Sequence, residues 1–425
     1  MLRFAILMLS ASLVLASAVG AETNYTALDL RSATQLALKH NPMISSAGAA
    51  ADMNKAGVDK ATSALRPTLD AEANYSYLSK ETLFGNTPIM EHDTQANRIV
   101  AGQLIYSGGA VQAGIKQAKQ GYAASNYGAE AVRADVLTNV SVAYFRARQA
   151  AEAIDVAQAS EKALASGYDA AVKLHESGVV TNSDVLRAKV ALTSAEAALI
   201  AAKNNYEVAK AALRTAIGLD QNQQIDINPG ATDAELNIAQ EKVIRPEVAA
   251  GEAAVQAADA GKAAAKAARQ PNVTLFADFY NQPVGAQFPR LTNTVMAGVI
   301  MKLNVFDGGL TRAKIAEADA ASRKAREDLE AQNRQVELEQ QTAEFNLNSA
   351  KARVETTATQ VQSAEESLRS LEIGYREGIS SLTDVLSAEA ALTSARVTRL
   401  AALYDVKIAQ ISLLRAFGHT DELTK

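Results

Sequence analysis

The side chains best placed to do chemistry are two aspartates that occur in the same sequence context. One stretch reads Gly178-Val-Val-Thr-Asn-Ser-Asp184-Val-Leu and the other reads Gly378-Ile-Ser-Ser-Leu-Thr-Asp384-Val-Leu. In each, a hydroxyl residue precedes the aspartate by three positions, which is the spacing of a capping box. The carboxylate then accepts the backbone N–H of the residue that starts a helix. We therefore predict a helix start at each site, with a carboxylate held near its positive end.

Residue types that usually mark an enzyme or a metal site form no pattern in this chain. The glycines at 108, 109 and 114 are not followed by the Lys-Ser or Lys-Thr of a phosphate-binding loop. No catalytic set of serine, histidine and aspartate stands out. Cysteine is absent, and the four histidines lack the spacing of metal ligands: His40, His92, His175 and His419. We therefore predict no enzyme, no cofactor and no metal.

The two aspartate stretches belong to a repeat that covers most of the chain. Their offset of 200 residues also carries Ile105-Tyr-Ser-Gly-Gly109 onto Val305-Phe-Asp-Gly-Gly309. Two proline pairs recur at an offset of 204, namely Pro42 with Pro246 and Pro67 with Pro271. A unit of this length far exceeds a solenoid repeat. The repeat indicates a duplicated half-protein with pseudo-twofold character.

The amino terminus and the composition limit where the chain can act. Residues 1–21 hold Arg3, an apolar run and then small residues, the pattern of a secretory signal peptide. An N-terminal membrane anchor is the alternative, but the run is shorter than the ~20 residues a spanning helix needs. No later segment has 18 consecutive apolar residues, so no helical span is predicted. The net charge of −5, with mixed signs, offers no basic surface for nucleic acid.

Long helices are predicted wherever proline is missing, from 89 to 228 and from 290 onward. Apolar or small residues recur there every seven positions, which specifies helices packed as a coiled coil. In the second half these are Leu347, Val354, Val361, Leu368 and Tyr375, and also Leu329, Val336, Ala343, Ala350, Thr357, Ala364 and Leu371. A helix over 110–175 would be roughly 100 Å long. Each long helix should end at a glycine, Gly178 or Gly378, and a second helix should run back to Gly218 or Gly418.

Four segments before the long helices alternate between apolar and polar residues, as β-strands with one buried face do. They cover about 68–83, 95–107, 272–284 and 292–306. Strands of this length with aromatic residues near their ends are typical of outer-membrane barrels. Soluble hairpins packed on helices would show a similar pattern. The signal peptide and the long helices favour the membrane interpretation.

Four strands cannot close a barrel, and an open strand edge in lipid leaves backbone groups without partners. Membrane-spanning strands would therefore require several copies of the chain. Two copies give eight strands, whose interior side chains fill, whereas three copies give twelve strands and leave a lumen. A conduit therefore needs at least three copies.

Taken together, these features resemble the TolC-like family of outer-membrane efflux and secretion channels. The resemblance covers nearly the whole mature chain and depends on the matched strand-to-helix junctions and the two Gly-x-x-x-x-x-Asp-Val-Leu tips. It implies a mixed α and β fold: a trimeric twelve-stranded barrel in the outer-membrane lipid, with four strands per chain, continued by a long α-helical tunnel across the periplasm. It also implies a closed tip that opens when a periplasmic adaptor and an inner-membrane pump dock.

The resemblance also assigns roles to residues at the tips. The adaptor-contact tips would be Gly178, Val179, Gly378 and Ile379, and the channel aperture and gate would be Asp384, Asp184 and Tyr375. The alternative for the aspartates is helix capping, and for Tyr375 it is helix packing. The chain departs from the family pattern at Ser387, where a second carboxylate is expected, and at Ser380, where an arginine links the gate.

These expectations combine into one organisation and one function. Residues 22–218 form repeat 1, 219–245 a linker, 246–418 repeat 2 and 419–425 a tail. The chain is expected to be a passive homotrimeric exit duct of a tripartite efflux pump or a type I secretion system. The alternative is a soluble periplasmic coiled-coil protein of structural or adaptor type.

Overall fold

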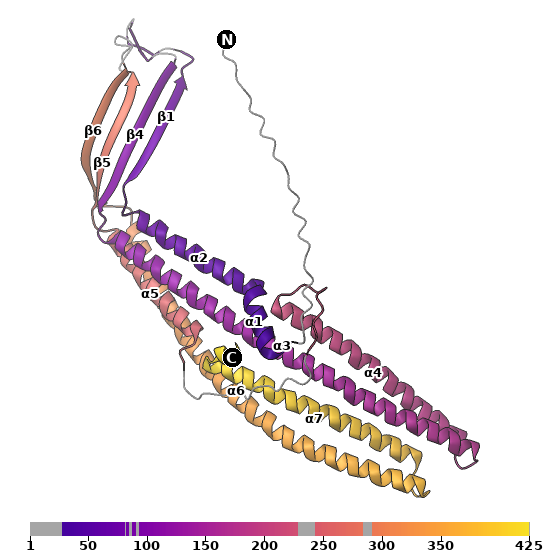
Figure 1. The fold of residues 1–425 in the computed structure, drawn as a ribbon. Helices are drawn as coiled ribbons and strands as arrows, with labels where there is room; N and C mark the ends of the chain where they lie inside the picture. Colours follow the sequence, from indigo (N-terminus) through magenta and orange to yellow (C-terminus); the bar gives the residue numbers. More distant parts are fainter. Residues whose placement is uncertain are drawn as a thin grey trace, which may run out of the picture.

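The structure is a computed structural model that describes residues 28–80, 82–84, 87–90, 93–227, 243–283 and 291–424. The predicted signal peptide and residues 228–242 of the predicted linker lie outside these ranges. The molecule is elongated, with a β-sheet at one end and the turns of two helical hairpins at the other (Figure 1).

The two halves of the chain contain the same order of long elements, which confirms the repeat. The first half comprises α1 (Leu30–His40), α2 (Pro42–Ser63), β1 (Thr68–Tyr77), β2 (Thr82–Phe84), β3 (Thr87–Met90), β4 (Asp93–Tyr106), α3 (Ala110–Glu176) and α4 (Asn182–Ile217). The second comprises α5 (Pro246–Ala267), β5 (Asn272–Pro283), β6 (Leu291–Lys302), α6 (Leu310–Arg376), α7 (Leu382–Phe417) and the 3-10 helix η1 (Thr420–Thr424). The long helices α3 and α6 both have 67 residues, and the return helices α4 and α7 both have 36.

Local sequence explains where the helices begin. α2 and α5 each start with a proline at the first helical position, where the missing N–H costs nothing. The side chain of Asn41 caps α2 by accepting the N–H of Met43 at 2.9 Å. Residues that follow the predicted seven-residue spacing are buried where helices pack, as at Val336, Ala343 and Ala350.

All four long strands form one antiparallel sheet in the order β1-β4-β5-β6. Each repeat supplies one hairpin, and the two hairpins join where β4 pairs with β5. β1 and β6 are the free edges of the sheet (Figure 1). The sheet of a single chain is therefore open on both sides.

One face of this sheet is apolar and exposed. The register places Ile99 between Ala71 and Phe279, and Phe279 opposite Val295. On the same face, Leu69 and Val295 at the two edges are 74% and 73% exposed. Nothing in the chain covers this face among the described residues. It has the composition of a barrel surface that meets lipid.

The opposite face is polar and carries an ion pair that joins the two repeats. Arg98 on β4 donates from Nε and Nη2 to both carboxylate oxygens of Asp278 on β5, at 2.6–3.0 Å. Asp278 is only 3% exposed. A two-pronged ion pair of this kind fixes the register of the strands that it bridges.

Phe276 interrupts the alternation because it lies on the polar face. Its ring covers Gly298 on β6, where an added Cβ would lie 3.0 Å from the ring. An aromatic side chain packed over a strand glycine compensates for the missing side chain. The pairing of these two residues explains the exception.

Two strand predictions differ from the structure at their ends. β1 stops at Tyr77, opposite the first residue of β4, and Thr82–Phe84 pairs instead with Thr87–Met90 in a separate small hairpin. β6 stops at Lys302 rather than at 306, because its partner β5 begins opposite Lys302. Residues 303–306 therefore have no partner strand within the chain.

The largest core lies at the middle of the molecule, where α3, α4 and α7 meet. Its fully buried side chains include Leu137, Tyr144, Phe145, Leu213, Ile217, Ile411 and Leu414. α1 and η1 close the core, and Thr34 donates to the carbonyl of Leu423 at 3.2 Å. The described start of the predicted linker also belongs to this core, because Ile225 and Ile227 are buried.

An ion-pair network fastens α5 to the long helices beside this core. Arg245 and Arg415 both bind Glu247, and Arg415 Nε also donates to Asp135 at 2.8 Å. Arg245 further pairs with Glu339 on α6. Burial alone would raise the pKa of Glu247, but the hydrogen bonds from the two arginines lower it to about 2. The network therefore depends on a charged Glu247.

We predict that this network weakens in acid. The pKa of Glu247 in the folded chain lies below its ordinary value of 4.5. Its stabilisation is therefore complete above pH 4.5 and is lost as the pH falls toward 2. The shift corresponds to roughly 3 kcal/mol of folding free energy. Thermal unfolding followed by helical circular dichroism should show Tm falling across this window, and falling less in a Glu247→Gln variant.

The exposed Glu252 on the same helix provides a matched control. Glu252→Gln should keep the pH profile of the wild-type chain. Identical profiles for the wild type and Glu247→Gln would contradict the prediction.

Candidate functional site

The candidate site is formed by the turns at the ends of the two helical hairpins. In the first turn Gly178 has a left-handed φ of +75°, and the N–H of Val179 donates to the carbonyl of Leu174 at 2.8 Å. In the second, Gly378 has a φ of +79°, and the N–H of Ile379 donates to Gly374 at 2.7 Å. Only glycine adopts this conformation readily, so the predicted helix ends are confirmed.

Both aspartates form the predicted capping boxes. Asp184 accepts the N–H and hydroxyl of Thr181 at 3.1 and 2.8 Å, and Asp384 accepts those of Ser381 at 3.1 and 2.7 Å. The hydroxyl hydrogen bond, followed by the backbone one, lowers the pKa of each carboxyl. Asp384 is exposed and Asp184 is partly exposed, and the lowered pKa keeps both side chains charged into acid. The capping interpretation is confirmed, and it leaves the charge available to solvent.

Tyr375 lies between the two hairpins rather than at the tip surface. It packs from α6 into an apolar cluster with Ala171 and Tyr168 of α3, Ala188 of α4 and Leu382 of α7. Burial, and then the charge of Asp184, raise the pKa of its hydroxyl. The packing role predicted for Tyr375 is therefore present, in a cluster to which α3, α4, α6 and α7 all contribute.

A second connection between the hairpins involves Arg187, which was not among the residues predicted from the sequence. Its Nη1 donates to Thr383 Oγ1 of α7 at 2.8 Å. The offset of 200 places Arg187 opposite Ser387 in the repeat. An arginine in one copy where the other has serine is a signal that a comparison of the repeats could have detected.

The tips enclose a cleft of about 590 Å³ that brings several predicted residues together. Val179 and Gly378 line it, as does Tyr375. Glu389 of α7 also lines it and is only 7% exposed. Burial, and in addition the charge of Glu372, raise the pKa of Glu389, while Arg396 opposes the shift. Its repeat counterpart is Lys189, so the difference between the copies marks this residue too.

The remaining predicted residues lie outside this cleft. Ile379 is 79% exposed at the outer end of the second turn. Asp384 is exposed on the first turn of α7. Among the described residues, no cluster of three or more histidine, aspartate or glutamate side chains is placed to hold a metal ion.

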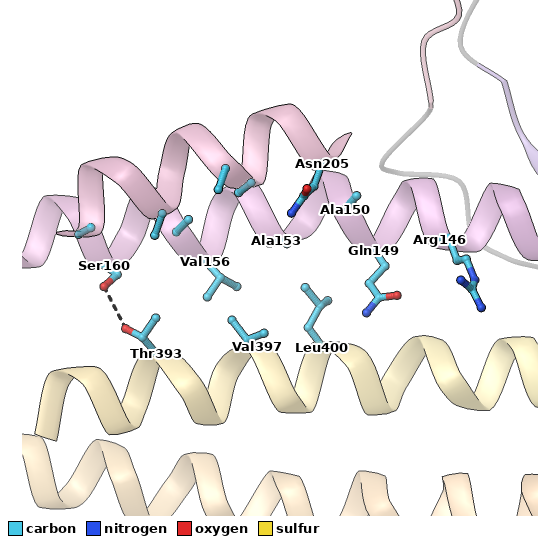
Figure 2. Close-up of a pocket in the computed structure, with 15 residues that line it drawn as sticks. Arg146, Gln149, Ala150, Ala153, Val156, Ser160, Asn205, Thr393, Val397 and Leu400 are labelled. Carbon is cyan, nitrogen blue, oxygen red and sulfur yellow. Dashed lines mark hydrogen bonds between the residues drawn. The ribbon is translucent and has the colours of Figure 1, made fainter. Parts of the chain in front are cut away.

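Further from the tips, a second cleft of about 540 Å³ separates the hairpins (Figure 2). Small side chains of α3 and α4 form one wall, and Val397 and Leu400 of α7 face them from the other hairpin (Figure 2). Ser160 and Thr393 make a hydrogen bond of 3.0 Å across it. Because the cleft leaves these side chains without close packing, the two hairpins are only weakly attached along its length.

None of the described helices combines the length and the apolar character that a membrane crossing requires.

Comparison with known proteins identifies relatives over nearly the whole length. The profile of a family described as outer membrane efflux protein matches residues 33–219 and 237–419. CyaE of Bordetella pertussis is 26% identical, covering 93% of this chain and 85% of its own sequence. TolC of Vibrio cholerae is 24% identical, covering 98% and 95%. The crystal structure of the outer membrane protein VceC from Vibrio cholerae superposes with a TM-score of 0.79 at 21% identity, covering 92% and 96%.

The two blocks of the family profile coincide with the two repeats, each of which supplies one strand hairpin and one helical hairpin. The chain therefore belongs to the outer membrane efflux protein family, and it is an outer-membrane exit duct for efflux or secretion.

Proposed function

We propose that this exit duct works as a homotrimer that conducts its substrates passively. Three sheets would close into a twelve-stranded barrel in lipid, and twelve tunnel helices would continue it across the periplasm. The observation that carries this proposal is the sheet with an exposed apolar face and two unpaired edges. Neither feature suits a soluble periplasmic protein, because unpaired edges and large apolar surfaces promote aggregation in water.

The duct needs no chemistry of its own. The only groups with shifted pKa values at the tips are carboxylates in caps, a packed tyrosine and one buried glutamate, and no nucleophile with an adjacent base is among the described tip residues. Energy for export would come from an inner-membrane pump. The exposed turns that hold Val179 and Ile379 would receive the periplasmic adaptor of that pump.

The homotrimer itself can be tested by extraction and by channel recording. Membranes that contain the chain should release it only with detergent, as particles with the mass of three copies. These particles should form conducting channels in planar bilayers. A soluble monomer in buffer would overturn the proposal.

The tip carboxylates should make the channel prefer cations. We expect Asp384→Asn to lower the cation-to-anion permeability ratio, because it removes three charges from the trimer. Asparagine still offers an oxygen to the N–H of Ser381, so the helix cap is kept. The measurement is the reversal potential in a salt gradient across a planar bilayer.

Asp184→Asn on the other tip provides the matched comparison, because its capping geometry is nearly the same. If both variants keep the selectivity of the wild type, the carboxylates act in capping alone. Asp384→Ala, which removes cap and charge together, shows how much of any change comes from loss of the cap.

Tyr375 and Arg187 should hold the tips in their closed arrangement. We expect Tyr375→Ala combined with Arg187→Ala to raise single-channel conductance several-fold, because the variant loses both of these connections at the tips. The same variant should let large antibiotics enter cells that express it. Single-channel recording and growth inhibition measure the two effects.

Tyr375→Phe is the control for this prediction, because it keeps the ring in the apolar cluster and removes only the hydroxyl. Its conductance should match the wild type. A double alanine variant with unchanged conductance would show that these contacts do not restrict the aperture.

A further inference from the structure

The helices that adjoin the sheet, α2, α3, α5 and α6, form a row. α2 packs on α3, α3 on α5, and α5 on α6, so that α2 and α6 are the edges. α5 is the repeat copy of α2, and α6 is the copy of α3. The contact of α3 with α5 is therefore a junction between repeat 1 and repeat 2. In a closed ring the reverse junction, between repeat 2 and repeat 1, has α6 of one copy beside α2 of the next.

The junction within the chain contains two glycines that another side chain approaches closely. An added Cβ on Gly261 of α5 would lie 3.2 Å from the side-chain nitrogen of Gln117. At the strand-to-helix turn, a Cβ on Gly108 would lie 2.1 Å from Cβ of Gln270. At both positions a side chain from the other repeat occupies the space beside the glycine.

The same glycines recur in the other repeat, and there the space is empty. Gly57 is the counterpart of Gly261, and Gly308 is the counterpart of Gly108. Neither has any atom within 4 Å of an added Cβ, leaving aside its own chain neighbours and helix backbone. The residues that correspond to the two glutamines are Glu317 and Arg66, and both are exposed.

The residues just before the long helix of each repeat show the same difference. Ile105 and Tyr106 at the end of β4 are 60% and 48% exposed, whereas their counterparts Val305 and Phe306 are 88% and 87% exposed. Tyr106 pairs with Val273 of β5. The corresponding partner for Phe306 is Leu69, which lies on the far edge of the same sheet and is reachable only from another copy.

We propose that the interface between copies repeats the junction within the chain, with Glu317 beside Gly57 of the next copy and Arg66 of that copy over Gly308. The inference rests on the proposed homotrimer and assigns the residues that close it. Arg66 then lies beside Asp307, whereas the equivalent pair within the chain, Gln270 and Ser107, is uncharged. The interface between copies is thus a charged version of a neutral internal one.

Applying the pairing of β4 with β5 to the interface between copies also gives the strand register that closes the barrel. Ala101 pairs with Ala277 and Ile99 with Phe279 within the chain. Between copies, Met301 therefore pairs with Ala73, and Val299 pairs with Tyr75. All four of these side chains belong to the apolar face, so the lipid-facing surface continues across the interface without interruption.

Cysteine pairs test the helix contact, because the chain has no cysteine of its own. A Gly57→Cys, Glu317→Cys variant treated with a short thiol crosslinker should give covalent dimers and trimers on denaturing gels. The matched control is Gly261→Cys with Gln117→Cys, which should react within one chain and remain a monomer on the gel.

Two outcomes separate this inference from the homotrimer. If the detergent-solubilised particles have the mass of three copies and the first pair gives no covalent oligomers, the assigned contact is wrong and the homotrimer stands. If the detergent-solubilised wild type and both cysteine variants have the mass of a single copy, the homotrimer fails and the inference fails with it.

Charge reversal tests the Arg66 contact independently. Arg66→Glu should lower the temperature at which the trimer dissociates, because it places a carboxylate beside Asp307 of the adjoining copy. Arg269→Glu makes the same charge change at the exposed residue next to Gln270, on the neutral junction, and should leave that temperature unchanged. Equal effects of the two variants, or no effect of Arg66→Glu, would overturn the assignment.

Discussion

The unpaired backbone of β1 and β6 is the constraint on which the rest of this structure depends. A strand edge in hydrocarbon leaves N–H and C=O groups without partners, at a cost of several kcal/mol for each group. The open four-stranded sheet is therefore compatible with lipid only when other copies pair with both edges. Once the strands close into a ring, the helices that continue from them must also stand in a ring. The tunnel thus follows from the barrel, and the position of the tips follows from the tunnel.

Duplication supplies this ring with two kinds of junction, and the sequence treats them differently. The junction within the chain is locked by the buried Asp278 and its arginine. At the tips the copies also differ, since Arg187 corresponds to Ser387 and Lys189 corresponds to Glu389. An exact copy would have made the two hairpins interchangeable. Arg187 gives the first hairpin the donor of the contact with Thr383 that joins the two hairpins.

The sequence was sufficient for the elements and insufficient for the contacts between them. Proline positions, seven-residue spacing and capping boxes are local signals, and they placed the long helices, the turns and Asp184 and Asp384 correctly. The end of β6 was missed because the alternation continues to Val305, whereas a strand ends where its partner ends. Arg187 was missed for a related reason. Its partner Thr383 belongs to the facing hairpin, 196 residues away in sequence, and only a comparison of unequal repeat positions reveals it.

The distribution of strong and weak contacts along the molecule determines where it can move. At the middle, a fully buried core and the ion-pair network of Arg245, Glu247 and Arg415 tie α3, α5, α6 and α7 together. Toward the tips, the hairpins are separated by a cleft with a single hydrogen bond described across it, and then meet again at Tyr375 and Arg187. Regions with few buried contacts open at the lowest free energy. In the proposed gating, rigid helices attached firmly at the middle and weakly at the end would convert the loss of the Tyr375 and Arg187 contacts into a displacement of the tips. An opening of this kind leaves the barrel and the middle core intact.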